Sequence, residues 1–127
     1  MRRTALIGIL FAMFFLLAAC SPASDPAAAV TQYFNALAAK DANRLSVLSC
    51  ADWAPKSQEL LDSITSVDVK LNSLACETLD NDGKNASVKC TGTLNATYNN
   101  ENQTLDLSTS TYVMVNQKGD WLVCGQK

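Results

Sequence analysis

The stretch Ala86-Ser-Val-Lys-Cys-Thr-Gly-Thr-Leu-Asn-Ala-Thr-Tyr98 carries an apolar or small residue at every second position. A β-strand turns alternate side chains to opposite faces, so this pattern predicts a long strand with one face on a core and the other in water. Gly92, in the middle of the stretch, permits sharp curvature. We therefore expect the fold to be built around a long, bent antiparallel strand.

The same alternation extends from residue 67 to residue 124 and predicts further strands on both sides of this one. Turn signals at residues 81–84, 99–102 and 118–119 divide the region into four expected strands, at residues 67–76, 86–98, 105–115 and 121–124. In the first strand the apolar phase shifts between Leu71 and Leu74, which predicts a β-bulge. In the third strand the apolar phase follows Leu105, Leu107, Thr109, Thr111, Val113 and Val115.

Helical spacing of apolar residues takes the place of this alternation before residue 67. Asp25-Pro26 is typical of a helix start, because aspartate accepts backbone N–H groups at the N-cap and proline needs no donor at the first position. A second, short helix is expected after Asp41 and a third at residues 55–64. The expected inward residues of the three helices are Val30, Tyr33, Phe34, Leu37, Ala38, Leu45, Val47, Leu48, Leu60, Leu61 and Ile64. Three helices on one concave face of a curved four-stranded antiparallel sheet make an α+β fold.

The first residues have the layout of an export leader. Arg2 and Arg3 precede an uninterrupted apolar run over residues 5–19, which spans about 22 Å as a helix and falls short of the ~30 Å hydrocarbon core. A permanent transmembrane helix is therefore the weaker interpretation. Leu17-Ala18-Ala19-Cys20 resembles the lipoprotein box of bacteria, and this resemblance implies that residues 1–19 are removed and that Cys20 carries acyl chains. Such chains would hold the protein in a lipid bilayer.

This interpretation divides the chain into a leader at residues 1–19, a lipidated tether at residues 20–24 and one α+β domain at residues 25–127. The protein is expected on the extracytoplasmic side of a bacterial cell membrane or outer membrane. Loss of Arg2 and Arg3 with the leader changes the net charge from −2 to −4. Because no basic cluster remains, nucleic acid is not expected as a partner.

Four cysteines remain beyond the tether, and an even number in a small exported domain predicts two disulfides. Cys76 and Cys90 are equidistant from Gly83, so a three-residue hairpin loop would place them opposite each other, within disulfide range. This leaves Cys50 to pair with Cys124. A zinc site is the alternative, but the chain has no Cys-x-x-Cys spacing and no histidine, and we expect neither metal nor cofactor.

Two stretches resemble the nuclear-transport-factor-two-like, or cystatin-like cone, superfamily. They are Pro26-Ala-Ala-Ala-Val-Thr-Gln-Tyr-Phe-Asn-Ala-Leu-Ala-Ala-Lys-Asp41 and Lys118-Gly-Asp-Trp-Leu-Val-Cys124. The chain is similar, more narrowly, to small bacterial lipoproteins that carry such a domain. The resemblance implies a cone of helices and curved strands around a pocket. That superfamily includes isomerases, dehydratases, transport factors and binding modules, so the fold alone selects no function.

A non-catalytic binding module is the favoured interpretation. Aromatic residues that could line the mouth of the cone and receive a small apolar ligand are Tyr33, Trp53, Tyr98, Tyr112 and Trp121. For the cone itself, a centre filled by helix side chains is favoured over an open pocket. A further alternative is an inhibitor or accessory subunit that binds a protein near the membrane surface, for which the threonine-rich face of residues 91–111 is a candidate.

An isomerase-like or dehydratase-like enzyme would need a carboxylate base and a hydroxyl donor inside the cone. The candidate bases are Asp52, Asp68 and Asp106, and the candidate donors are Tyr33, Tyr98 and Tyr112. The alternation places Asp68 and Asp106 on the outer face, and the tyrosines lie on apolar stripes where core packing is the usual role. We therefore expect no catalytic residue and no enzyme.

Overall fold

The computed structural model describes residues 25–127. The expected leader and the expected lipidation site at Cys20 lie outside these residues. Within the described part of the chain, none of the helices has the length and apolar character needed to cross a membrane.

Three helices form the first half of the domain, as predicted. Their bounds are Pro26–Ala38 for α1, Ala42–Val47 for α2 and Ala54–Ile64 for α3. The Asp25 carboxylate accepts the N–H of Ala28 at 3.2 Å, and the Asp41 carboxylate accepts the N–H of Arg44 at 3.0 Å. These two caps satisfy backbone donors that have no partner inside a helix, and so they define where α1 and α2 begin.

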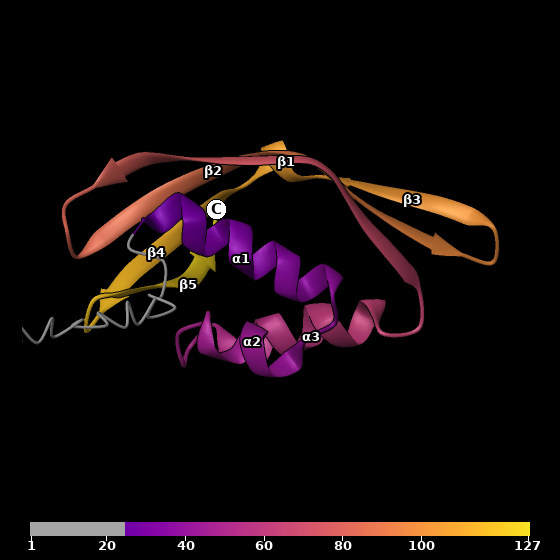
Figure 1. Cartoon of the computed structure of the whole chain (residues 1–127), viewed down its shortest axis with the longest axis horizontal. Coiled ribbons are helices and arrows are strands. Elements are labelled where there is room, and N and C mark those ends of the chain that lie inside the picture. The colour runs from indigo at the N-terminus through magenta and orange to yellow at the C-terminus, as the bar shows by residue number, and fades with distance from the viewer. Residues whose placement is uncertain (1–24) are drawn as a thin grey trace, which may run out of the picture.

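The second half is an open antiparallel sheet in the order β1-β2-β4-β5, with β3 pairing the other half of β2 (Figure 1). The strands are β1 Asp68–Asn81, β2 Asn85–Tyr98, β3 Glu101–Asp106, β4 Thr111–Gln117 and β5 Asp120–Gln126. The predicted long strand is therefore β2, which pairs β1 along one edge and both β3 and β4 along the other.

The prediction of four strands is wrong in one place, because the expected strand at residues 105–115 is broken into β3 and β4. A 3-10 turn, η1 (Leu107–Thr109), separates them. The Asp106 carboxylate accepts the Ser108 N–H at 2.9 Å and the Ser108 hydroxyl at 2.7 Å, which stabilises the turn. The turn also changes the apolar phase: Tyr112 and Met114 of β4 are buried, whereas Val113 and Val115 are only half-buried.

The predicted bulge in β1 is present and explains Gly92. Asn72 pairs with Thr93 and Ala75 with Thr91, so two residues of β1 lie opposite Gly92 alone. Gly92 has a φ of +101°, and a Cβ there would lie 2.6 Å from the carbonyl oxygen of Asn72. Only glycine fits this position, and the bulge bends the long hairpin around the helices.

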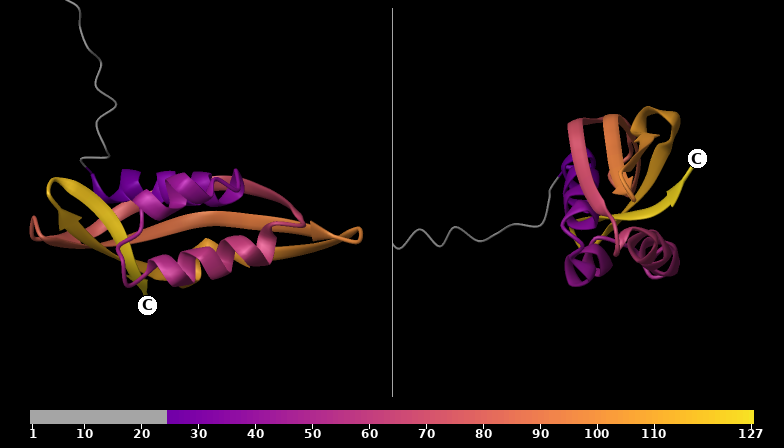
Figure 2. Two further views of the ribbon diagram at one scale, coloured as in Figure 1. Left: turned by 90° about the horizontal axis from the view of Figure 1, so that it is seen from below. Right: turned by 90° about the vertical axis from the view of Figure 1, so that its right-hand side faces the viewer.

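The helices lie against the concave face of the sheet (Figure 2), and their buried apolar side chains fill its centre. Helix α1 contributes most of them, and the sheet contributes Val88, Met114 and Val123, none of which has any exposed surface. The buried α1 residues are Pro26, Ala27, Ala29, Val30, Tyr33, Phe34, Ala36 and Leu37. Helix α2 faces inward through Leu45, but Val47, which was expected inside, is 67% exposed. A helix of two turns buries only one narrow stripe, and Val47 lies outside it.

Two disulfides tie these layers together, in the pairing expected from the sequence. Cys76 and Cys90 face each other across the β1–β2 hairpin, whose loop is residues 82–84. Cys50, in the loop after α2, is bonded to Cys124 of β5. The Cys50 N–H also donates to the carbonyl of Val123 at 3.0 Å, so this loop lies along the edge of β5. The helical layer is thus fastened to the last strand.

Candidate functional site

The five aromatic residues predicted to line a cavity do not lie around one site. Tyr33, Tyr112 and Trp121 are at most 5% exposed and belong to the core. Trp53 is half-buried beside them, and Tyr98 is 57% exposed at the far end of β2. The helices therefore fill the centre of the fold, where an open cone would have its pocket.

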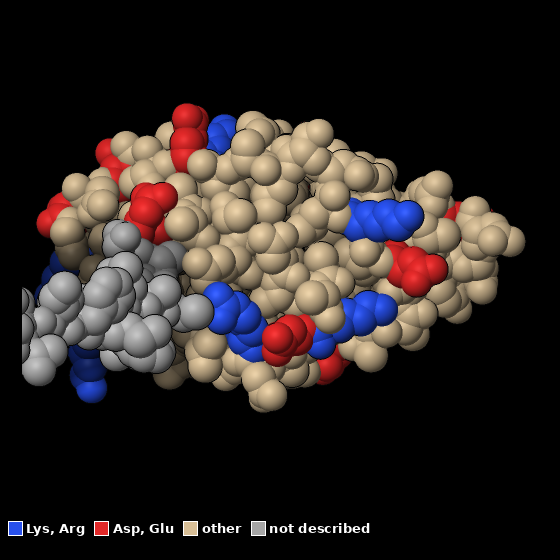
Figure 3. All heavy atoms as spheres, viewed as in Figure 1, with Lys and Arg blue, Asp and Glu red and all other residues tan. Residues whose placement is uncertain are grey.

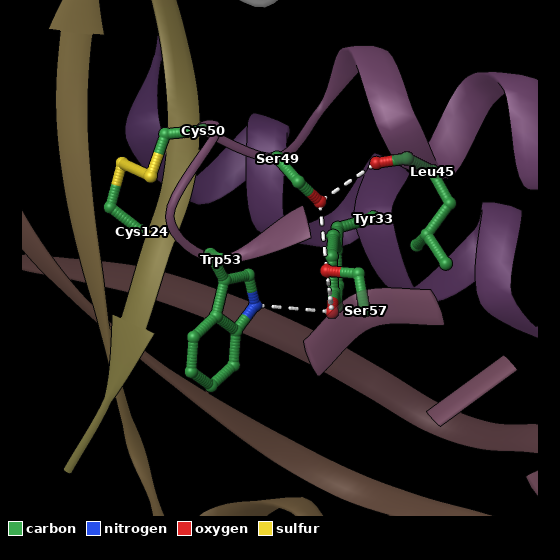
Figure 4. Close-up of a disulfide and its surroundings, with 7 residues drawn as sticks. All are labelled: Tyr33, Leu45, Ser49, Cys50, Trp53, Ser57 and Cys124. Carbon is green, nitrogen blue, oxygen red and sulfur yellow. Dashed lines mark hydrogen bonds between the residues drawn. A yellow bond between two sulfur atoms is a disulfide. The ribbon is translucent and has the colours of Figure 1, made fainter. Parts of the chain in front are cut away.

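A chain of hydrogen bonds crosses this filled centre and joins all three helical segments (Figure 4). The Trp53 ring N–H donates to the Tyr33 hydroxyl at 3.3 Å, and that hydroxyl lies 2.8 Å from the hydroxyl of Ser57. The Ser57 hydroxyl lies 2.9 Å from that of Ser49, which donates to the carbonyl of Leu45 at 2.8 Å. Every polar side-chain atom in this hydrogen-bond network therefore has a partner.

The two ends of this chain fix its direction. An indole N–H can only donate and a carbonyl can only accept. The Ser49 proton goes to Leu45, so Ser49 accepts from Ser57, and Ser57 in turn accepts from Tyr33. The Tyr33 hydroxyl thus donates to Ser57 and accepts from Trp53, and its proton is not available to a substrate.

The sequence reasoning missed Ser49 and Ser57, which are 7% and 2% exposed. A signal for Ser57 was present, because Ser57, Leu61 and Ile64 share one face of α3 at helical spacing. A serine within an apolar stripe must find a hydrogen-bond partner when it is buried.

The candidate carboxylates lie away from these hydroxyls. Asp52, Asp68 and Asp106 are all exposed, and the Ser108 hydroxyl and N–H that bind Asp106 lower the pKa of its carboxyl. Burial, with a smaller contribution from Tyr33, raises the pKa of Tyr112 to about 12. The structure therefore does not bring a carboxylate base and a free hydroxyl donor together at these positions. In residues 25–127, His, Cys, Asp and Glu side chains form no group of three suited to a metal ion.

An open groove, which we call the arm groove, lies between the end of α3 and the inner face of β2 and β3. Its volume is about 360 Å³, and its lining residues are Ser63, Ile64, Ser66, Val67, Ala96, Tyr98 and Gln103. The next residue pair on the same face, two positions from Ala96 and Gln103, is Leu94 and Leu105. The Leu105 side chain is 55% exposed. Tyr98 lines this hollow and Leu105 lies outside its lining, further along the same inner face; both large apolar side chains are exposed to solvent.

The β2–β3 hairpin that carries these residues projects beyond the helices (Figures 1 and 2). Its loop is Asn99-Asn100, and both residues have positive φ, 49° and 64°. This is the two-residue turn that matches the twist of a tight hairpin. We call residues 93–106 the arm.

Two larger hollows differ from the arm groove in having charged side chains in their lining. The hollow of about 490 Å³ at the β1–β2 turn is lined by polar residues such as Asp80, Asp82 and Lys127. One of about 560 Å³ over β1 and β2 is bordered by Glu77 and Lys89. In Figure 3, acidic side chains gather at the end of the domain that carries the β1–β2 turn, and the basic side chains are spread among acidic ones. The arm groove is therefore the candidate binding site.

Comparison with known proteins shows the fold and no closer relationship. No protein-family model and no curated protein matches the sequence. The solution structure of a SEC-C motif containing protein from Rhodopseudomonas palustris matches with a TM-score of 0.60 at 11% identity, over 84% of this chain and 80% of the other. A crystal structure from Xanthomonas campestris, assigned to the calcium/calmodulin-dependent protein kinase II association domain, gives 0.57 at 16% identity, over 84% and 89%.

A protein of unknown function from Mycobacterium tuberculosis gives a TM-score of 0.56 at 14% identity, and here the match covers 78% of this chain and 65% of the other. At these identities the likeness is one of fold. The chain has an α+β fold of three helices on an open antiparallel sheet, shared with proteins of several kinds.

Proposed function

We propose that this chain is a bacterial lipoprotein, anchored through acyl chains on Cys20, whose nuclear-transport-factor-two-like domain binds a partner without catalysis. The arm groove is the binding site. The observation that carries the proposal is that Tyr98, 57% exposed, lines a hollow of about 360 Å³ on the inner face of the arm, where Leu105 further along is 55% exposed. Large apolar side chains exposed along one strand face beside a hollow are typical of a surface that a partner covers.

Two features support export. Leu17-Ala18-Ala19-Cys20 follows a short apolar run, and the described domain contains two disulfides. Disulfides persist in oxidising compartments and are rare in the bacterial cytosol.

The filled centre of the fold decides where a partner would bind. Tyr33, Phe34 and Tyr112 pack edge to face there, with ring centroids 5.8 and 5.3 Å apart. A ligand in the centre would have to displace these rings, whereas the arm groove is already open. Contact with a partner at the groove would also need no conformational change of the core.

The start of α1 and the arm groove lie near opposite ends of β1. The Asp25 carboxylate lies 3.4 Å from the Thr78 hydroxyl, so the start of α1 is beside Thr78 of β1. At the other end of β1, Val69 pairs with Ala96 of the arm. Nine residues of strand separate these points by roughly 30 Å, and the tether at residues 21–24 reaches at most about 14 Å. The groove is therefore on the part of the domain far from the proposed attachment point.

The test has two parts, and both use protein expressed from the full sequence in its native host. The first is membrane fractionation of Cys20→Ser, which should release the protein or leave it uncut. The second is native mass spectrometry of the wild-type protein and of Tyr98→Ser in lipid nanodiscs. We expect a bound partner or ligand with the wild type and its loss with Tyr98→Ser. The control is Tyr112→Phe. This variant changes a buried ring and should therefore retain the partner.

A further inference from the structure

Resting on the proposed function, we propose that the partner binds as an extended peptide segment that adds a strand to the free edge of β3. The segment has Lys or Arg at both ends and apolar side chains at the alternate positions that face the arm groove. The juxtaposition that carries this is an unpaired strand edge beside an exposed apolar face, with an acidic residue at each end of the strand.

The edge of β3 can be described from the hairpin register. A two-residue turn makes Tyr98 and Glu101 a hydrogen-bonded pair, and such pairs alternate along an antiparallel ladder. Gln103 and Leu105 therefore also bond to β2, while the backbones of Asn102, Thr104 and Asp106 point outward. Within residues 25–127 no strand pairs with that outward edge. The Asp106 carbonyl accepts the Thr109 hydroxyl at 3.0 Å, so Asn102 and Thr104 offer the open groups.

The inner face of the arm gives an added strand its specificity. Residues paired across a sheet share a face, so the peptide residues opposite Leu105 and Gln103 lie beside the arm groove. Apolar side chains there would cover Leu105 and enter the hollow next to Tyr98. The outer face of the arm carries Thr93, Asn95, Thr97 and Thr104 and stays polar.

Charge selects the kind of segment. Glu101 and Asp106 stand at the two ends of β3, and both are exposed. Lys40, beside the groove, is already bound to the carbonyls of Thr65 and Val67, at 3.1 and 2.6 Å. Lys70 of β1 pairs with Asn95 on the outer face. A segment with a basic residue at each end therefore meets complementary charge.

The same charges argue against two other occupants. Residues 93–106 contain Glu101 and Asp106 but no Lys or Arg, so a second copy that paired β3 with β3 would bring four acidic residues together without a basic partner. The chain's own tether is held at Asp25, roughly 30 Å from the arm, and is too short to reach it. A separate polypeptide fits where these do not.

The experiment uses the full-length lipoprotein in nanodiscs and three labelled hexapeptides: Lys-Val-Thr-Val-Thr-Lys, its acidic form Glu-Val-Thr-Val-Thr-Glu, and Lys-Val-Pro-Val-Pro-Lys, which lacks the N–H groups of an added strand. Fluorescence anisotropy measures binding, and hydrogen exchange reports the amides of residues 101–106. We expect the basic peptide to bind, to slow exchange at Asn102 and Thr104, and to bind about tenfold more tightly than the other two.

The matched variants are Thr104→Pro, which removes an outward N–H but no bond to β2, and Thr104→Val, which keeps that N–H. Thr104→Pro should weaken binding by about tenfold and Thr104→Val should not. The proline peptide tests the same requirement if Thr104→Pro does not fold. Equal binding of the acidic peptide, unchanged exchange in β3, no binding at millimolar peptide, or a dimer abolished by Thr104→Pro would overturn the proposal. If Tyr98→Ser loses the native partner while Thr104→Pro retains it, strand addition is refuted and the proposed function stands.

Discussion

The hydroxyl of Tyr33 on α1 lies 2.8 Å from the hydroxyl of Ser57 on α3, inside the core. The two helices are thus joined by a hydrogen bond as well as by apolar packing. Because Trp53 donates to Tyr33 and Ser57 donates to Ser49, neither hydroxyl can be removed without leaving a buried partner unsatisfied.

Ser57→Ala should therefore lower the free energy of unfolding by about 1–3 kcal/mol, because it leaves the Tyr33 proton without an acceptor and Ser49 without a donor. Urea denaturation of the oxidised protein measures this. Ser63→Ala, on an exposed position of the same helix, is the control and should change stability by less than about 0.5 kcal/mol. Equal effects of the two substitutions would mean that the hydrogen-bond chain does not stabilise the fold.

Gly92→Ala tests the bulge that bends the β1–β2 hairpin. Gly83 and Gly92 both have positive φ, +88° and +101°, but an added Cβ meets nothing at Gly83 and the Asn72 and Ser73 carbonyls at Gly92. Gly83→Ala should cost about 1–2 kcal/mol from backbone strain alone. Gly92→Ala should cost several kcal/mol in total, because the hairpin must shift. Thermal unfolding of both variants separates the clash from the strain, and a similar cost for both would exclude a tight bulge.

The two disulfides should differ in the stability that they contribute. Cys50 and Cys124 are 74 residues apart in the chain, whereas Cys76 and Cys90 are 14 apart. Loop-closure entropy gives about 4 kcal/mol for the longer loop and about 3 kcal/mol for the shorter. Urea midpoints of the two Cys→Ser double variants, measured without reductant, check the order. The opposite order would show that the Cys50–Cys124 loop does not fasten the helices to β5 as described.

Tyr112 should make the fold sensitive to alkali. Its pKa is raised from 10.0 to about 12 by burial, so the folded state holds the phenol proton more tightly than the unfolded chain does. The resulting stability is present below pH 10 and is lost as the pH rises from 10 to 12. Tyr112→Phe should flatten the fall in unfolding free energy over that range. A fall that persists unchanged in Tyr112→Phe would assign it to other groups.

Local signals in the sequence predicted much of this fold. Asp25-Pro26 marks the start of α1, Gly83 marks the middle of the first hairpin, and Gly92 marks the bulge, because each has a requirement that few other residues meet. The Cys76–Cys90 pairing followed from the hairpin geometry. These features depend on residues near one another in the chain.

The errors have a common physical cause, which is that alternation reports a face and not its depth of burial. Tyr98 shares the inner face of β2 with Val88, yet α3 ends before it can cover Tyr98, so the predicted cavity residue is exposed. Similarly, the Asp106–Ser108 contact breaks the third expected strand. After the break, Tyr112 faces the core where the alternation predicted its neighbour Val113. The buried serines, Ser49 and Ser57, find their partners on other helices, and contacts between helices are not visible in a single sequence.

The proposed function depends most on the state of Cys20, because the lipid determines the compartment and its oxidising environment. Intact-mass analysis of the protein isolated from membranes of its native host tests this directly. We predict a chain that begins at Cys20, carries an acyl mass on that residue and has no free thiol among Cys50, Cys76, Cys90 and Cys124. A chain that keeps residues 1–19, or one that begins beyond Cys20 without an acyl mass, would contradict it.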